Sequence, residues 1–293
     1  MTRTTRRMLS LLMAVMMLFA LAACGGETQD NENGDDTNVT ATGVEDGVLT
    51  VGMECQYAPY NWTQMTDENG AVAIANNPGS YANGYDVMIA KKICEANGWD
   101  LEIMAIDWGG LTPALESGQI DMVIAGQSMT EDRMAEVDMA GPYFYASIVC
   151  VTKADSPLAN ANGISELTGT CTAQSGTIWY DSCLGQIEGA DIQAASETAP
   201  AMIMAVESGT VDFICTDMPT AMGAVATYPD LTILDFTGQD DNFVVDEGEI
   251  NIGISVAKGN TTLFDAANDV LGTMTAEDFE SIMNDALAVQ PEI

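Results

Sequence analysis

The sequence predicts an α/β fold with mostly parallel sheets flanked by helices. Strand-like and helix-like segments alternate along the chain, which is the pattern of parallel strands joined by crossover helices. In the first half, strands are predicted at 48–52, 101–106 and 120–126, and helices at 85–98 and 111–118. The second half has the same alternation. Strands are predicted at 169–174, 211–216 and 231–236, and helices from about residue 178, at 201–209 and after Pro219. A strand at 250–258 and helices at 261–274 and 276–289 complete the chain.

Two segments of the chain resemble each other at an offset of 91 residues. LESGQIDMVIAG (115–126) and VESGTVDFICTD (206–217) both run from a helix end through a glycine turn into an apolar strand. A common helix-to-strand turn would also produce this match, because glycine is the usual residue just after a helix. Either way, Gly126 and Asp217 fall at the carboxyl ends of strands, where open α/β sheets bind ligands.

The first 23 residues are typical of an export signal. They contain three arginines, a short apolar run and small residues before Cys24. LAAC (21–24) resembles the lipobox of bacterial lipoproteins, in which Cys24 is the lipidated residue. A plain secretory signal with a chance cysteine is the alternative. Residues 24–46 are polar and acidic and predict a flexible tether.

The charge of the chain excludes several classes of partner. Without Arg3, Arg6 and Arg7, five basic residues remain against 44 acidic ones, a net charge of about −39. Nucleic acid and anionic membrane surfaces are therefore excluded as electrostatic partners. Histidine is absent, which excludes serine–histidine catalysis and histidine zinc sites. No phosphate loop, dinucleotide fingerprint or CxxC pair occurs, so we expect neither cofactor nor metal.

Six cysteines remain after Cys24, at positions 55, 94, 150, 171, 183 and 215. An even number in an exported protein permits disulfides, but the spacings select no pairing. Several of them lie in apolar strand-like runs and could equally be buried thiols.

Arg133 is the only arginine that follows the export signal. Thr130 is a plausible N-cap, which makes Arg133 the third residue of a helix, where the macrodipole disfavours a cation. An anion bound by the guanidinium, by helix-start N–H groups and by Ser128 would explain this position. A surface salt bridge with Glu136 or Asp138 is the alternative.

Other candidates follow predicted strands. Asp217 ends a strand and could hold an ammonium group, cap the next helix, or do both. Tyr57, Tyr60 and Trp62 beside Glu54, together with Trp108, are candidate pocket walls, and we expect about two of the four to line a pocket, because core aromatics would give the same pattern. QSGT (174–177) could bring backbone N–H groups close to an anion.

Taken together, VGMECQYAPYNW, IDWGGLTPALESGQIDMVIAGQSMTEDR, TAQSGT and SGTVDFICTD resemble the extracellular solute-binding proteins of polar amino-acid ABC transporters. The resemblance covers about residues 47–290. It implies a type II periplasmic-binding-protein fold with two lobes that close about a two-strand hinge. Lobe 1 is then expected at 48–144 plus 252–293 and lobe 2 at 145–251.

The resemblance also implies the binding roles. In the family, an arginine, a serine and a threonine hold the ligand carboxylate, and these match Arg133, Ser128 and Thr177. The ammonium contacts match Asp217 and Gly126. The side-chain pocket of the family matches Glu54, Tyr57 and Trp108. The carboxylate of Glu54 favours a polar or cationic amino acid, and the rings of Tyr57 and Trp108 would add cation–π contacts.

The function implied is that of a non-enzymatic, lipid-anchored receptor outside the cytoplasm. It would bind a free amino acid as a monomer and deliver it to an ABC permease, with the membrane contacted only through lipidated Cys24. Two alternatives stay open: a fold-sharing dehydratase that acts on a prephenate-like acid, and a sensory amino-acid receptor.

Overall fold

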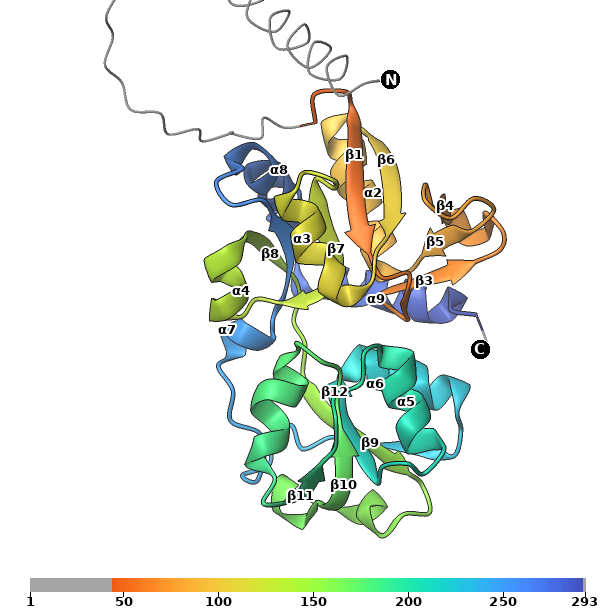
Figure 1. The fold of residues 1–293 in the computed structure, drawn as a ribbon, viewed down its shortest axis with the longest axis vertical. Helices are drawn as coiled ribbons and strands as arrows, with labels where there is room; N and C mark the ends of the chain where they lie inside the picture. The colour runs from red at the N-terminus through yellow and green to blue at the C-terminus, as the bar shows by residue number, and fades with distance from the viewer. Residues whose placement is uncertain (1–43, 292–293) are drawn as a thin grey trace, which may run out of the picture. The chain divides into compact units, whose positions relative to one another are not determined.

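The computed structural model describes residues 44–291 and contains three β-sheets with flanking helices (Figure 1). The predicted export signal, Cys24 and almost all of the tether lie outside the described residues. Among the helices that are described, none is long and apolar enough to cross a membrane.

The first sheet has five strands in the order β6-β1-β7-β14-β8. β1 pairs in parallel with β6 and β7, whereas β14 runs antiparallel to both β7 and β8. The sheet is therefore mixed, because its fourth strand comes from the late part of the chain. In that order the strands are Asp100–Ala105, Val48–Met53, Met122–Ser128, Ile252–Val256 and Asp138–Phe144. The helices of this part are α2 (Tyr85–Asn97), α3 (Leu111–Glu116), α4 (Glu131–Glu136), α8 (Thr261–Leu271) and α9 (Ala276–Val289).

The second sheet has the order β11-β10-β12-β9-β13 and the same pattern of directions. β10 is parallel to β11 and β12, and β9 is antiparallel to β12 and β13. Its strands are Gly189–Ile192, Thr168–Thr172, Phe213–Asp217, Ile148–Lys153 and Leu231–Leu234, with helices α5 (Ala199–Glu207), α6 (Met218–Thr227) and α7 (Glu247–Ile250). Strand for strand, this order matches the first sheet, with β12 in the place of β7. We call the first sheet with α2, α3, α4, α8 and α9 lobe 1, and the second sheet with α5 and α6 lobe 2.

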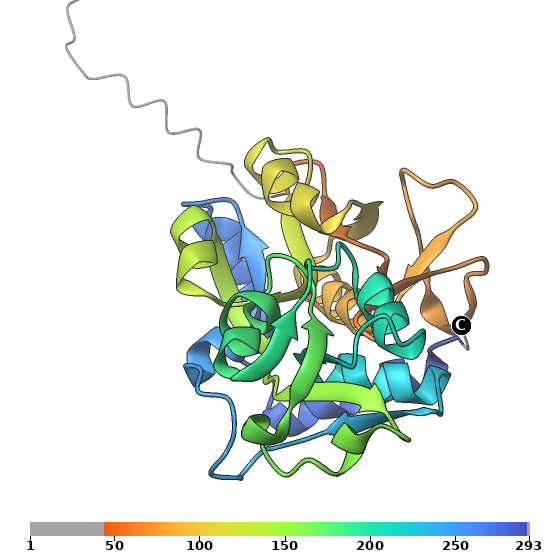
Figure 2. The ribbon, with the colours of Figure 1, turned by 60° about the horizontal axis from the view of Figure 1, so that its bottom comes forward.

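A small antiparallel sheet, which the sequence did not predict, stands beside lobe 1. Its order is β2-β3-β5-β4, formed by Gln56–Tyr57, Asn61–Gln64, Tyr81–Asn83 and Val72–Ala73. It is attached to β6 through a bridge between Ile74 and Ile103, and both ribbon views show it, in orange, at the side of this lobe (Figure 1, Figure 2). Strands of two to four residues are too short to show a periodic pattern.

The repeated segments have the same backbone geometry. Gly118 and Gly209 follow α3 and α5 with φ of 73° and 74°. Their N–H groups donate to Leu115 and Val206 carbonyls, each at 3.1 Å. Both turns thus need the left-handed backbone conformation that glycine adopts without steric cost.

The aspartates of the two repeated segments, Asp121 and Asp212, make the same hydrogen bonds in both lobes. Asp121 accepts a hydrogen bond from the Thr50 N–H at 2.8 Å, and Asp212 accepts one from the Thr170 N–H at 2.7 Å. In return each aspartate N–H donates to the carbonyl of the same threonine at 2.8 Å. The match of sequence therefore marks one structural unit, helix, turn and strand, that occurs twice.

The chain passes between the two sheets twice. Residues 145–147 connect β8 to β9, and residues 235–251 connect β13 to β14 (Figure 1). β14 lies between β7 and β8, so the chain passes through lobe 2 before it returns to complete lobe 1. The lobe boundaries at 144/145 and 251/252 stay a prediction.

Most helices match their predicted positions, with one difference. The segment after Ile178 forms a wide helical turn at Trp179–Cys183 followed by a tighter turn at Leu184–Gln186, rather than an α-helix. The six described cysteines are buried free thiols. Among the side chains that the structure describes, no group of three or more from cysteine, aspartate and glutamate is arranged to hold a metal ion.

Candidate functional site

The carboxyl ends of strands from both lobes carry buried polar side chains that lie close to one another. Glu54 follows β1, Ser128 ends β7, Gln174 follows β10 and Asp217 ends β12. All four have at most 5% of their surface exposed. Polar groups are buried only where hydrogen bonds or a ligand satisfy them, so the partners of each group indicate what the site can bind.

Asp217 is both a helix cap and part of a contact between the lobes. Its Oδ1 accepts a hydrogen bond from the Thr220 N–H at 2.8 Å, which confirms the predicted N-cap of α6. Its Oδ2 accepts one from the Tyr57 hydroxyl at 2.9 Å. The Thr220 hydroxyl in turn donates to the Tyr57 oxygen at 3.1 Å. Burial raises the pKa of Asp217, and hydrogen bonds from Thr220 and Tyr57 oppose this rise.

Gly126 lies against the ring of Tyr57. A Cβ atom at Gly126 would come within 2.8 Å of the Tyr57 Cε1 atom, and the residue has a φ of 64°, so only glycine fits. Its N–H donates to the Tyr143 hydroxyl at 3.0 Å, and that hydroxyl donates to Asp86 at 2.7 Å. A contact from Gly126 to a ligand would therefore come from its carbonyl or Cα rather than its N–H.

Arg133 is the third residue of α4, as predicted, and Thr130 caps this helix by accepting the Arg133 N–H at 3.2 Å. The guanidinium donates to the Ser128 carbonyl of lobe 1 and to the Gly176 carbonyl of lobe 2, the latter at 3.3 Å. Burial lowers the pKa of Arg133 to about 10, while nearby Glu136 opposes this change. The guanidinium therefore stays charged at neutral pH.

The surface salt bridge that we considered for Arg133 is not formed. The ion pairs found between described side chains include those of Lys153 with Glu207 and Asp230 and that of Lys258 with Asp138, and none of these involves Arg133. Asp138 instead pairs with Lys258, whose Nζ lies 2.9 Å from Oδ1 of the aspartate. The guanidinium has neutral carbonyl partners, an arrangement that leaves its charge free for an anion.

The two predicted aromatic walls have different surroundings. The Trp108 ring centroid lies 5.6 Å from the Arg133 guanidinium carbon, within the range of a cation–π contact. Tyr57 instead stacks on Tyr60, with ring centroids 5.0 Å apart. In the described part of the chain the ring contacts do not include one between Tyr57 and Trp108.

The QSGT turn connects the separate groups. The Thr177 hydroxyl donates to the Gln174 carbonyl at 2.7 Å and so closes the turn. Gly176 accepts from Arg133, as described above. The Gln174 amide Nε2 lies 3.4 Å from Glu54 Oε2. The turn therefore brings lobe 2 into contact with both the arginine and the glutamate of lobe 1.

Glu54 is the least satisfied of the buried polar groups at the strand ends. Only 5% of its surface is exposed, and Oε1 has no hydrogen-bond partner. Burial raises its pKa from 4.5 to about 7, the Gln174 amide lowers it, and the charge of Asp107 raises it further.

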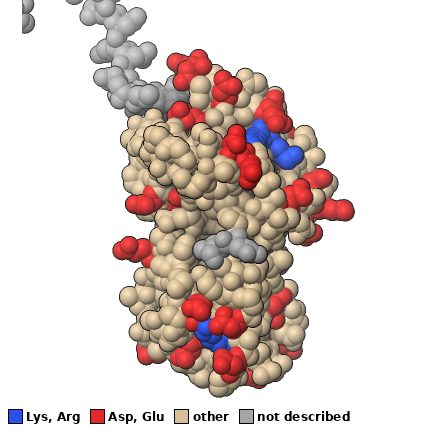
Figure 3. Space-filling model, turned by 90° about the vertical axis from the view of Figure 1, so that its right-hand side faces the viewer, with Lys and Arg blue, Asp and Glu red and all other residues tan. Residues whose placement is uncertain are grey.

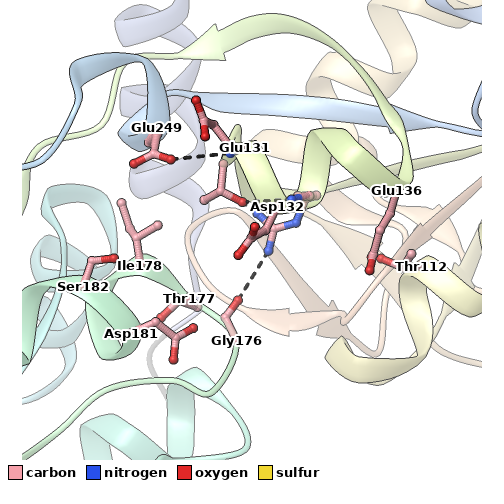
Figure 4. A pocket seen from close by; sticks show the side chains of 12 residues that line it. Thr112, Glu131, Asp132, Glu136, Gly176, Thr177, Ile178, Asp181, Ser182 and Glu249 are labelled. Carbon is pink, nitrogen blue, oxygen red and sulfur yellow. Dashed lines mark hydrogen bonds between the residues drawn. The ribbon is translucent and has the colours of Figure 1, made fainter.

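Arg133 is one of the residues that line a groove of about 370 Å³, shown in Figure 4. Gly176, Thr177 and Asp181 of lobe 2 face Glu131 and Asp132 of α4 across it. Apart from Arg133, the charged residues that line this groove are acidic. Arg133 and Thr177 belong both to the groove and to the predicted site, whereas Glu54, Tyr57, Trp108 and Asp217 do not line the groove.

The chain is similar to proteins of a known family. A model of the bacterial extracellular solute-binding proteins, family 3, matches residues 49–285. The chain belongs to this family. Among the relatives of this solute-binding protein is a probable histidine-binding protein of Neisseria gonorrhoeae, 25% identical over 86% of this chain and 84% of the relative. Another is the L-cystine-binding protein TcyA of Bacillus subtilis, 27% identical over 76% and 77% of the two chains.

A solved structure supports the fold as well. ArgBP from T. maritima in its arginine-bound form is 29% identical and covers 78% of this chain and 97% of its own, with a TM-score of 0.63. The solute-binding protein described here thus has the two-lobed type II fold, with mixed sheets flanked by helices.

Sequence reasoning overlooked two buried polar residues of this solute-binding protein. Thr220 binds both Asp217 and Tyr57, and Gln174 contacts Glu54. A signal existed for Thr220, because an N-cap at 217 places residue 220 where its N–H meets the cap. Gln174 stood in the QSGT motif, but nothing in the sequence pairs it with Glu54, which is 120 positions away.

Proposed function

We propose that the protein is a receptor that binds one polar amino acid between its lobes and delivers it to an ABC permease. Its membership of the solute-binding family supports the receptor role. Its relatives include a probable histidine-binding protein, an L-cystine-binding protein and an arginine-bound protein, which supports an amino acid as the ligand. A zwitterion is also the object that fits the charges of the candidate site.

The observation that carries the proposal is a separation of two charges, the half-buried guanidinium of Arg133 and the buried carboxylate of Asp217. Arg133 in lobe 1 has no carboxylate partner, and Asp217 in lobe 2 has no cation partner, among the residues that the structure describes. Lobe 2 nevertheless meets the small sheet at Asp217 and Tyr57, and it meets lobe 1 at Gly176 and Arg133. A molecule with a carboxylate at one end and an ammonium at the other would satisfy both charges and link the lobes.

In this proposal Arg133, Ser128 and Thr177 hold the ligand carboxylate, and Asp217 with Gly126 holds its ammonium. Glu54, Tyr57 and Trp108 contact the side chain. The unpartnered oxygen of Glu54 supports a polar or cationic side chain. Because Trp108 stacks near Arg133, we place it beside the ligand carboxylate rather than at the far end of the side chain.

We propose lobe boundaries at 144/145 and 251/252, which agree with the points where the strands change sheet. We also propose that residues 1–23 are an export signal, that Cys24 carries the lipid, and that the protein works outside the cytoplasm as a monomer. Labelling with a radioactive fatty acid, compared between the native chain and Cys24→Ser, tests the anchor.

A receptor rather than an enzyme is the function we favour. One observation keeps the dehydratase alternative open, because a carboxyl with a pKa of about 7, as Glu54 has, can act as a general acid at neutral pH. Turnover of prephenate by the purified protein would overturn the receptor proposal. A sensory receptor would use the same site, and only transport measurements in cells distinguish it.

A thermal-shift screen against all amino acids tests the function, because a ligand that binds only the folded state raises Tm. We expect Arg133→Ala to weaken binding of the best ligand more than about 100-fold, since it removes a charge-assisted, two-pronged contact. Arg133→Lys should also bind poorly, because an ammonium cannot form that fork.

The matched control is Lys92→Ala, which removes an exposed cation elsewhere on lobe 1. Circular dichroism should show both variants of Arg133 folded. Unchanged affinity of Arg133→Ala in calorimetric titration would remove Arg133 from the site.

A further inference from the structure

We propose that Glu54 and Gln174 form a side-chain subsite that works in two protonation states. A cationic side chain is bound with release of one proton from Glu54, and a neutral amide side chain is bound with that proton retained. The inference rests on the proposed function, because it concerns the far end of the same amino-acid ligand.

The geometry of the pair supports a subsite rather than a structural contact. Glu54 comes from the end of β1 in lobe 1 and Gln174 from the turn after β10 in lobe 2, so the pair spans the lobes. Both side chains are more than nine-tenths buried. The contact between them is long, 3.4 Å, and uses only one carboxyl oxygen. The other oxygen, Oε1, is buried without a partner, which is costly unless a ligand group binds it.

The surroundings of Glu54 contain no cation to hold its charge. The titratable groups that face it are the carboxylate of Asp107, the thiol of Cys55 and the hydroxyl of Tyr57. Asp107 repels a negative charge on Glu54, and the thiol and the hydroxyl are uncharged at neutral pH, since burial raises the pKa of both. None of the ion pairs within residues 44–291 includes Glu54.

Gln174 suits both states of the carboxyl group. An amide offers an N–H donor and a carbonyl acceptor, so it can donate to a carboxylate or accept from a carboxylic acid. With Glu54 ionised, the free oxygen would accept from a guanidinium or ammonium. With Glu54 protonated, its O–H and carbonyl would pair with a neutral carboxamide or ureido group.

The exchange of charge is balanced. The protonated carboxyl gives its proton to the buffer, and the positive charge of the ligand replaces it, so the net charge of the buried subsite is unchanged. Because burial raises the pKa of Glu54 to about 7, the carboxyl is about nine-tenths protonated at pH 6. Affinity for a cationic ligand should therefore rise about tenfold per pH unit up to pH 7 and then level off.

Calorimetric titration of the purified protein with L-arginine and with its neutral isostere L-citrulline tests the inference, with L-glutamine as a second neutral probe. Each titration is made at pH 6.0 and at pH 8.5 in two buffers of different ionisation enthalpy, which gives the number of protons released. We expect about 0.9 proton for arginine at pH 6.0, about none at pH 8.5, and about none for the neutral ligands at either pH.

Glu54→Gln should abolish the proton release and weaken arginine more than citrulline. The matched control Glu102→Gln changes an exposed carboxyl of lobe 1 and should release protons as the native protein does. Asp86 and Asp217 are also buried carboxyls whose pKa is raised, that of Asp86 to about 6, but hydrogen-bond donors already approach both of them. Proton release that survives in Glu54→Gln would therefore come from another buried carboxyl and overturn the inference.

The outcomes separate the two proposals. If no amino acid binds at either pH, the proposed function is wrong and the subsite inference falls with it. If arginine binds without proton release at pH 6.0, or if only neutral ligands bind at pH 8.5, the inference is wrong while the receptor function stands.

Discussion

At the scale of single residues, Asp217 and Glu54 show how hydrogen bonding sets the state of a buried carboxyl group. Both are almost fully buried, and burial raises the pKa of each. Asp217 is approached by a backbone N–H and a tyrosine hydroxyl at less than 3 Å, which favours its charged form. Glu54 has one long contact and a repelling neighbour, so its pKa reaches about 7. In the proposed site this difference suits Asp217 to the ammonium group that every amino-acid ligand carries, and Glu54 to side chains that can be cationic or neutral.

Glu54 should lower the stability of the protein at neutral and alkaline pH. Its pKa is 4.5 in the unfolded chain and about 7 in the folded protein, so the folded state binds more protons between these values. Stability therefore falls as pH rises from about 4.5 to 7, by about 3 kcal/mol at most. Glu54→Gln removes this loss, and urea unfolding should show it more stable than the native protein at pH 8 but similar at pH 4.5.

Glu102→Gln is again the control, because an exposed carboxyl should give the same difference in stability at both pH values. A stability gain of Glu54→Gln that does not depend on pH would mean that the carboxyl is not protonated in the folded protein.

At the scale of elements, the doubled unit of helix, turn and strand explains why both lobes present polar residues at the same edge. The same strand order in both sheets puts β7 and β12 in equivalent places. The residues at 126 and 217 then have different chemistry at equivalent points: a glycine that makes room for Tyr57, and an aspartate that binds its hydroxyl. One scaffold thus supplies two different halves of the proposed site.

The two glycine turns offer a matched test of this unit. Gly118→Ala and Gly209→Ala should each lower the free energy of unfolding by about 1 kcal/mol, because an L-residue is strained at their positive φ. Space is not the cause, since nothing lies within 4 Å of a Cβ atom at either position. Urea unfolding measures both changes, and the double variant should lose about 2 kcal/mol because the sites are independent.

Gly185→Ala is the control for these turns. It also has open space around its Cβ position but does not have a positive φ. A loss at Gly185 as large as at Gly118 and Gly209 would show that backbone strain is not the cause.

At the scale of the whole molecule, the charge of the chain is far from neutral. The sequence carries 44 acidic and 8 basic residues, and the face in Figure 3 shows acidic side chains over both lobes with few basic ones between them. Like charges repel most strongly when the chain is compact, so folding is opposed at low ionic strength. The same field would favour the approach of a cationic ligand.

Salt should therefore stabilise the protein. We expect Tm to rise by about 3 °C, equivalent to about 1 kcal/mol, when the salt concentration is raised from 10 to 200 mM. Sodium chloride and choline chloride should act alike, because screening does not depend on the cation. A rise with sodium alone, measured by scanning calorimetry, would indicate a specific cation site instead.

The sequence predicted the site unevenly, and particular residues show why. Thr130 and Asp217 were predicted as caps because capping acts over three residues and is written in consecutive positions. The small sheet around Tyr57 was overlooked because its strands are too short for a period. The pairing of Glu54 with Gln174 and of Tyr57 with Asp217 joins positions at least 120 residues apart, and single-sequence patterns carry no signal for such contacts.

By itself, the sequence determined the α/β class, the doubled turn, the helix caps and the acidic, histidine-free chemistry, because each depends on nearby residues or on composition. The lack of a salt bridge at Arg133 among the described side chains needed the tertiary structure, which pairs Lys258 with Asp138 and turns the guanidinium toward two carbonyls. The raised pKa of Glu54 needed it too, since burial and the neighbours of a side chain are properties of packing. Local interactions fix the elements, and only their assembly decides which charges are left without a partner.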